Sequence, residues 1–131
     1  MSTPEARLQS ATAAYQKLQV ELSDTVDARQ RLDVQLTETN MVKNEFATLK
    51  PVNEVYKLIG PVLVKQDQTE AKANVDKRLS FIKAEIQRIE GQIKDITEKS
   101  EKRRMEIVEI QTAHQTALQQ GAKASTSVQV Q

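Results

Sequence analysis

The chain has 131 residues, of which only 3% are aromatic, and it contains neither tryptophan nor cysteine. The absence of cysteine excludes disulfides, thiolate catalysis and zinc–thiolate sites. Its 19 basic and 18 acidic side chains leave a net charge of +1, which gives no field that would attract nucleic acid or an anionic membrane. We therefore expect no nucleic-acid partner and no membrane partner. A content of 38% hydrophobic residues with few aromatics favours long helices over a large globular core.

The first residues contain helix-start signals and no targeting signal. Ser2 and Thr3 can cap free amides, Pro4 is tolerated in a first turn, and Glu5 favours the positive end of a helix dipole. This segment lacks the apolar region of a signal peptide, and no apolar run of the chain is long enough to cross a bilayer. We therefore expect a cytoplasmic protein.

A first helix is predicted over about residues 4–50, because Pro51 disfavours helical geometry in the residue before it. A heptad repeat runs along this helix and predicts a seam that packs against another helix. Its two seam positions are Leu8, Tyr15, Leu22, Arg29, Leu36 and Lys43, and Ala11, Leu18, Thr25, Leu32, Thr39 and Phe46.

A β-hairpin is predicted over about residues 52–66, the only strand-like stretch of the sequence. Aromatic and β-branched residues dominate it, and Gly60-Pro61 marks a turn. Alternation counted through the turn places Tyr56, Leu58, Val62 and Val64 on one face and Val55, Ile59 and Leu63 on the other. Two apolar faces and two open edges make an isolated hairpin marginal, so we expect strands of other chains to complete it. The alternative is that the hairpin folds back onto the helices.

A second helix is predicted over about residues 68–120, with Asp67 as its cap and Gly121 at its end. Residues 122–131 are rich in Ser, Thr, Gln and Ala, and we expect them to be disordered. The heptad of this helix is the clearest periodic signal of the chain. Its seam positions are Leu79, Ile86, Ile93, Ser100, Ile107 and His114, and Ile82, Ile89, Ile96, Arg103, Ile110 and Ala117.

The short connection predicts a mainly α fold with a single domain over residues 1–121. In it, two helices form a long antiparallel coiled coil with one central β-hairpin, and residues near 15 lie opposite residues near 108. Polar seam residues such as Thr25, Arg29, Ser100 and Arg103 either specify the register or loosen the seam. At the tip far from the hairpin, apolar residues exceed what one seam needs, so they either bind other apolar chains or pack internally. These tip residues are Leu8, Ala11, Tyr15, Leu18, Met105, Ile107, Val108, Ile110 and Leu118.

No pattern in the sequence predicts catalysis, a cofactor or a bound metal. His114 is the single histidine and sits at a seam position, which is typical of packing. The glycines are isolated, so no phosphate-binding loop exists. The basic residues Lys99, Lys102, Arg103 and Arg104 alternate with glutamates, as on a solvated helix face. We therefore expect that the protein is not an enzyme.

The stretch from Gln35 to Asn40, followed by Val55-Tyr56-Lys57-Leu58-Ile59-Gly60-Pro61-Val62-Leu63-Val64-Lys65-Gln66, resembles the β class of the prefoldin family. The likeness continues through Glu70–Val75 to Ile89 and Glu90, where it is to one eukaryotic member of that class. A single hairpin also indicates the β class, because α-class chains carry two.

The resemblance implies an ATP-independent chaperone built as a heterohexamer of two α-class and four β-class chains. Such a chain would have five partner subunits, two α-class and three further β-class. Their hairpins would join in an intersubunit β-barrel, to which this chain would contribute Val55, Tyr56, Leu58, Ile59, Val62, Leu63 and Val64. The apolar tip residues named above would hold non-native proteins such as actin and tubulin for delivery to the cytosolic group II chaperonin. The alternative is a structural coiled-coil tether or adaptor.

Overall fold

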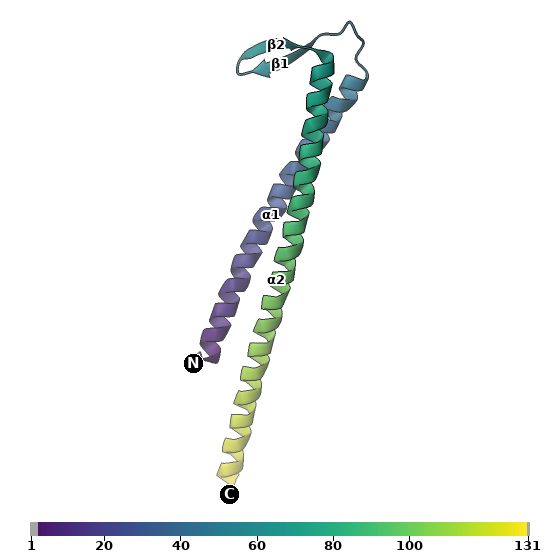
Figure 1. Cartoon of the computed structure of the whole chain (residues 1–131). Coiled ribbons are helices and arrows are strands. Elements are labelled where there is room, and N and C mark those ends of the chain that lie inside the picture. The colour runs from purple at the N-terminus through teal and green to yellow at the C-terminus, as the bar shows by residue number, and fades with distance from the viewer. Residues whose placement is uncertain (1–2, 131) are drawn as a thin grey trace. The chain divides into compact units, whose positions relative to one another are not determined.

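The computed structural model describes the backbone of residues 3–130 and the side chains of residues 3–122. It consists of helix α1 (Pro4–Ala47), strands β1 (Val55–Ile59) and β2 (Val62–Gln66), and helix α2 (Gln68–Val130) (Figure 1). The two strands pair antiparallel in a two-stranded sheet. The predicted fold class, two long helices with one central β-hairpin, is therefore confirmed.

The two helices begin where side chains can satisfy their first amides. Thr3 caps α1, because its Oγ1 accepts from the amide of Ala6 at 3.0 Å, and Pro4 then occupies the first helical position. Asp67 caps α2 in the same way, accepting from the amide of Glu70 at 3.2 Å. Both predicted starts are confirmed.

The helix ends differ from the predictions. Helix α1 ends at Ala47, about one turn before Pro51, and the amides of Thr48 and Leu49 bond to carbonyls three residues back in a tightened last turn. Helix α2 runs through Gly121 to Val130, so the predicted end near residue 120 is wrong. The reason is that Gly121 does not adopt the positive φ of a helix-ending glycine. The predicted disorder of residues 122–131 falls, apart from Ala122, on residues whose side chains lie outside this description.

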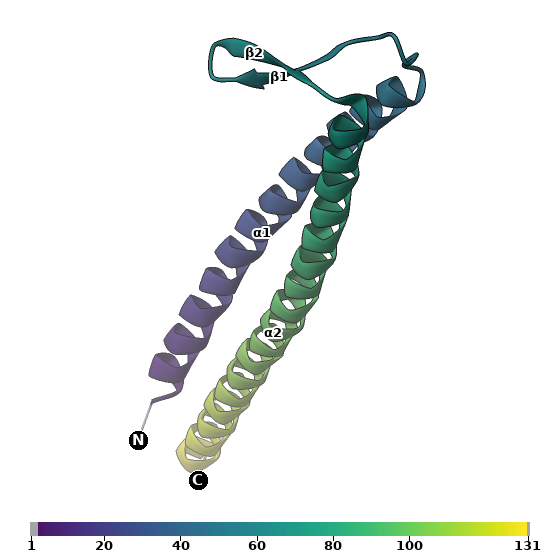
Figure 2. The ribbon, with the colours of Figure 1, turned by 45° about the horizontal axis from the view of Figure 1, so that its top comes forward.

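The chain divides into two compact units, which are described separately. Unit 1 comprises Met1–Asp24 and Ile93–Gln131, and unit 2 comprises Thr25–Gln92, including the hairpin. In each unit a segment of α1 runs antiparallel to a segment of α2 (Figure 2). The buried side chains of the described residues are Ala11, Ile96, Ser100 and Ile110 in unit 1, and Thr39, Ala71, Leu79, Ile82, Ile86 and Ile89 in unit 2.

The predicted heptad seams are largely confirmed, because nearly all of their positions are buried or half-buried. The exceptions are Lys43, Arg103 and Ala117, whose side chains are exposed. Lys43 reaches out to Asp76, with Nζ 3.3 Å from Oδ1, and Arg103 pairs with Glu106 on its own helix at 3.1 Å. Long charged side chains at a seam keep their charge in water in this way.

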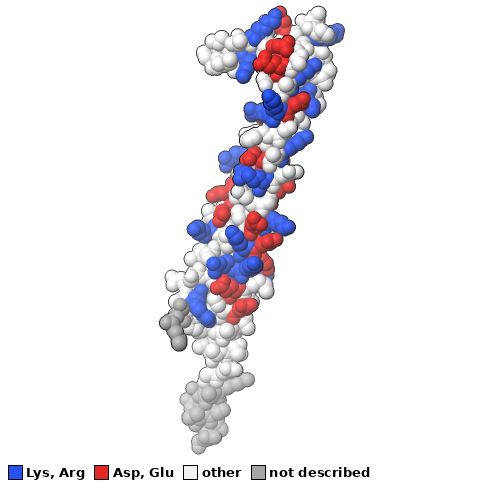
Figure 3. Space-filling view, viewed as in Figure 1, with Lys and Arg blue, Asp and Glu red and all other residues white. Residues whose placement is uncertain are grey.

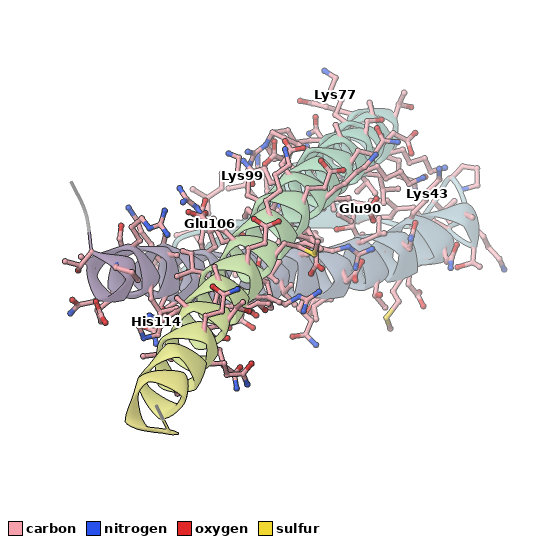
Figure 4. The ribbon with its side chains drawn as sticks, turned by 90° about the horizontal axis from the view of Figure 1, so that it is seen from below. Lys43, Lys77, Glu90, Lys99, Glu106 and His114 are labelled. Atoms are coloured by element: carbon pink, nitrogen blue, oxygen red, sulfur yellow. The ribbon has the colours of Figure 1, made fainter. Side chains whose placement is uncertain are left out.

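Polar pairs fix the alignment of the helices within each unit. In unit 1, Gln19 Nε2 donates to Ser100 Oγ at 2.5 Å, and His114 Nε2 lies 3.7 Å from Glu5 Oε1. In unit 2, the guanidinium of Arg29 donates to Glu90 Oε1 at 2.7 and 3.2 Å; Glu90 is labelled in Figure 4. In each of these pairs, and in the pair of Lys43 with Asp76, the two residue numbers have the same sum. The α1 and α2 segments are therefore paired in the same register within unit 1 and within unit 2.

This register corrects the predicted alignment by about one helical turn. Tyr15 lies near Arg104, whereas the sequence predicted that Tyr15 would lie opposite residues near 108. The pKa of Arg104 itself is raised chiefly by its hydrogen bonds to Glu101. Because Ser100 and Arg29 are both engaged across the seam, the structure favours the interpretation that polar seam residues specify the register.

Candidate interaction surfaces

The hairpin pairs Tyr56 with Lys65, Leu58 with Leu63 and Ile59 with Val62. Residues that pair directly across an antiparallel sheet lie on the same face. One face therefore carries Tyr56, Leu58, Leu63 and Lys65, and the opposite face carries Val55, Lys57, Ile59, Val62 and Val64. The predicted division of the faces was wrong for the second strand, because a two-residue turn pairs even-numbered with odd-numbered residues.

The turn itself explains this pairing. Gly60 has a φ of 58° and is the only described residue with a positive φ. Pro61 fixes a negative φ at the next position, so the turn has the II′ pattern, in which the first central residue is glycine. A turn of this type matches the twist of the strands and joins them by two residues only.

Both faces of the hairpin expose large apolar side chains. Of the seven predicted interface residues only Val55 is half-buried, and the other six are exposed, with Leu58 at 67% and Val62 at 56%. The tip of the hairpin bears no charged side chain in the view of Figure 3. The outer edges of β1 and β2 have no strand beside them within the described chain. Apolar faces with open edges are what strands of another chain would pair with.

The side chain of Glu54 bonds to both strands at the base of the hairpin, on the face that carries Tyr56. Its carboxylate accepts from the Tyr56 hydroxyl at 2.6 Å and from Lys65 Nζ at 3.2 Å. These two donors, the tyrosine first, lower the pKa of Glu54 below its ordinary value, and the Glu54 carboxylate in turn raises the pKa of Tyr56. The three side chains come from the linker and from both strands, so they hold the hairpin stem together.

This arrangement predicts a weak acid sensitivity of the hairpin. Because the pKa of Glu54 is lowered in the folded chain, its stabilising effect is complete above the ordinary carboxyl pKa of 4.5 and is lost as the pH falls through the folded value. The protection of amides 54–66 against exchange, measured relative to the intrinsic exchange rate at each pH, should therefore decrease below about pH 4.5. A Glu54→Gln variant should not show this decrease. If the variant keeps the same pH profile, Glu54 does not hold the stem.

The nine predicted tip residues lie in unit 1, but they differ in exposure. Ala11 and Ile110 are buried in the seam, and Leu8, Tyr15, Leu18 and Ile107 are half-buried. Met105, Val108 and Leu118 are exposed. Met105 and Val108 are three residues apart and thus lie on one side of α2. Of the nine predicted tip residues, therefore, only Met105, Val108 and Leu118 are exposed in the single chain.

Unit 1 also contains a hollow that the sequence did not indicate. It has a volume of about 440 Å³ and is lined by Ala6, Arg7, Ser10, Glu106, Glu109, Ile110 and Ala113. Its lining is largely polar, because it includes the charged side chains of Arg7, Glu106 and Glu109. The predicted tip contains only one of these residues, Ile110, since a heptad pattern identifies seams and not the hollows beside them.

The other candidate residues give no chemical centre. His114 is half-buried beside Glu5, consistent with packing near a helix seam. Among residues whose positions are described, no cluster of His, Cys, Asp or Glu has the arrangement of a metal site. Over the same part of the chain, no helix combines the length and apolar character needed to cross a bilayer.

Comparison with known proteins agrees with the fold. The family model described as prefoldin subunit matches residues 9–120. Prefoldin subunit 6 of Homo sapiens is 48% identical over 120 residues, covering 92% of each chain, and that of Saccharomyces cerevisiae is 48% identical over 98 residues, covering 75% of this chain and 86% of its own. The crystal structure of the prefoldin beta subunit from Thermococcus strain KS-1 matches with a TM-score of 0.73 at 23% identity, covering 82% of this chain and 94% of that chain.

The chain belongs to the prefoldin subunit family. Its fold is that of a prefoldin β subunit, and its eukaryotic relatives are named prefoldin subunit 6, so the resemblance found in the sequence is confirmed. The chain is accordingly a subunit of a prefoldin chaperone and assembles with other prefoldin subunits.

Proposed function

We propose that this chain is one of six subunits of a cytoplasmic, ATP-independent prefoldin made of two α-class and four β-class chains. It joins the other five through its hairpin, in a shared β-barrel. The assembly holds non-native proteins, such as actin and tubulin, and delivers them to the cytosolic group II chaperonin. The chain itself catalyses no reaction in this proposal.

The observation that carries this proposal is the exposed hairpin. A single chain gains nothing from six large apolar side chains in water, since each would be worth roughly 1.5–3 kcal/mol if fully buried. A coiled-coil tether has no use for such a surface. An intersubunit barrel would bury both faces and pair both edges of the hairpin, which abolishes the open edges.

The composition test is native mass spectrometry of the complex purified gently from its own cells through a tag on this chain. The expected result is one particle of six different small chains that travels with cytosolic chaperonin. A homodimer, or a complex with one large unrelated protein, would contradict the proposal and favour the tether.

Client holding is tested with the reconstituted complex and chemically denatured actin, in the absence of ATP. Replacing both Met105 and Val108 by serine should weaken suppression of actin aggregation by about threefold to tenfold, because each half-exposed side chain loses part of its burial against the client. The control is Phe81→Ser, which removes an exposed apolar side chain of α2 in unit 2. Equal effects of the two variants, or no effect of either, would argue against client contact at this tip.

A further inference from the structure

The chain enters the hairpin and leaves it in different ways. Helix α1 ends at Ala47 and β1 begins at Val55, so an entry segment of seven residues connects the helix to the hairpin. On the way out only Asp67 separates β2 from α2. The exit therefore ties β2 closely to the start of α2, whereas the longer entry needs contacts of its own to hold a direction.

A turn shapes the entry segment. The amide of Asn53 donates to the carbonyl of Lys50 at 3.0 Å, and the amide of Lys50 donates to Asn53 Oδ1 at 2.7 Å. Pro51 occupies the second position of this turn, where its fixed φ is favoured. The turn closes on itself, but these bonds do not attach it to the rest of unit 2.

Gln68, the first residue of α2, makes that attachment. Its Nε2 donates to the carbonyl of Lys50 at 2.8 Å and to the carbonyl of Asn53 at 2.7 Å. A carboxamide nitrogen has two hydrogens, so both donors are used on the two ends of the same turn. The glutamine side chain is half-buried, whereas Lys50 and Asn53 are exposed.

Hydrogen bonds, not apolar packing, hold the turn in this place. A hollow of about 420 Å³ is lined by residues 51–55 and 65–69, which belong to the turn, the hairpin stem and the start of α2. Most of these residues are exposed. With no apolar core under the stem, loss of the Gln68 bonds would leave the entry segment free to move.

We infer that Gln68 is a positioning residue that sets the direction of the hairpin by fixing the Lys50–Asn53 turn to the start of α2. The inference builds on the proposed assembly through the hairpin. In that assembly the strands must meet those of neighbouring subunits in register, so a stem held in one direction favours assembly over a stem that moves.

The test uses Gln68→Glu, which keeps the shape of the side chain but presents a carboxylate to the two carbonyls. A glutamate at the first position of a helix is favoured by the dipole, so α2 itself should be unaffected and the far-UV circular dichroism unchanged. Two measurements follow: hydrogen exchange of residues 48–66 in the isolated chain, and incorporation into the complex when the chain is co-expressed with the other prefoldin subunits. We expect faster exchange and about tenfold lower incorporation, since two hydrogen bonds are lost.

The rescue variant is Gln68→Lys, whose ammonium group can donate to both carbonyls. It should restore both measurements to within about twofold of the original chain, and Gln87→Glu, at an exposed position of α2, should change neither. Normal incorporation of Gln68→Glu, or equal failure of the glutamate and lysine variants, would overturn the inference. If the unaltered chain does not assemble with prefoldin subunits, the proposed function fails, and the exchange data alone decide whether Gln68 holds the turn.

Discussion

Replacing Val62 by aspartate should prevent this chain from entering the prefoldin complex while leaving its helices folded. Val62 is 56% exposed in the single chain, so a charge there costs the isolated fold little. In an intersubunit barrel the same carboxylate would be taken out of water without a partner, which is costly. We expect incorporation to fall by at least about a hundredfold when the variant competes with the original chain for the same partner subunits. Native mass spectrometry of the purified complexes measures the ratio.

The matched control is Val34→Asp. Val34 is the same residue type with the same exposure, 56%, but it lies on α1 and not on the hairpin. This variant should be incorporated like the original chain. Equal loss for both variants would mean that any added charge disturbs assembly. If Val62→Asp is incorporated like the original chain, the hairpin does not form part of the interface with other subunits.

Sequence periodicity was enough to predict the helices and most of their buried residues. Heptad spacing identifies which side chains face a partner helix, and residues such as Leu79, Ile86 and Ile89 are buried accordingly. The pattern is weaker near the hairpin. A strict heptad continued back from Leu79 points to Lys72, whereas the neighbouring Ala71 is the buried residue, because the two helices end there and the packing is no longer periodic.

Periodicity could not give the register. Sliding one helix by a turn brings apolar layers against apolar layers again, so such alignments differ little in burial. The difference comes from a few polar contacts, such as Gln19 with Ser100 and Arg29 with Glu90. These depend on side-chain reach across the seam, which a list of seam positions does not contain.

The hairpin faces were missed for a related reason. The apolar content of the strands predicted a hairpin with apolar residues on both faces, which the structure has, but the division of residues between the faces depends on the number of residues in the turn. With Gly60 and Pro61 as the only turn residues, Val62 pairs with Ile59 and shares its face. One residue more or less would exchange every side chain of β2 between the faces.

Replacing Ile82 by alanine should cause the largest loss of stability in the isolated chain. Ile82 is 2% exposed and lies in the seam of unit 2. Removing a buried aliphatic side chain of this size costs about 2–5 kcal/mol, from lost burial and from the cavity left behind. Urea unfolding followed by circular dichroism should show the midpoint lowered by about 1–2 M, given a typical slope for small proteins.

The control variant is at Phe81, the residue directly before Ile82 in the sequence. Phe81 is a larger apolar residue but is 65% exposed, so Phe81→Ala should shift the free energy of unfolding by no more than about 0.5 kcal/mol. Similar losses for both variants would contradict the seam assigned to α2. Val62→Asp should leave the urea midpoint nearly unchanged, since the hairpin buries little in the single chain. The two kinds of variant thus separate folding from assembly: the seam of unit 2 stabilises the chain, and the exposed hairpin is available to other subunits.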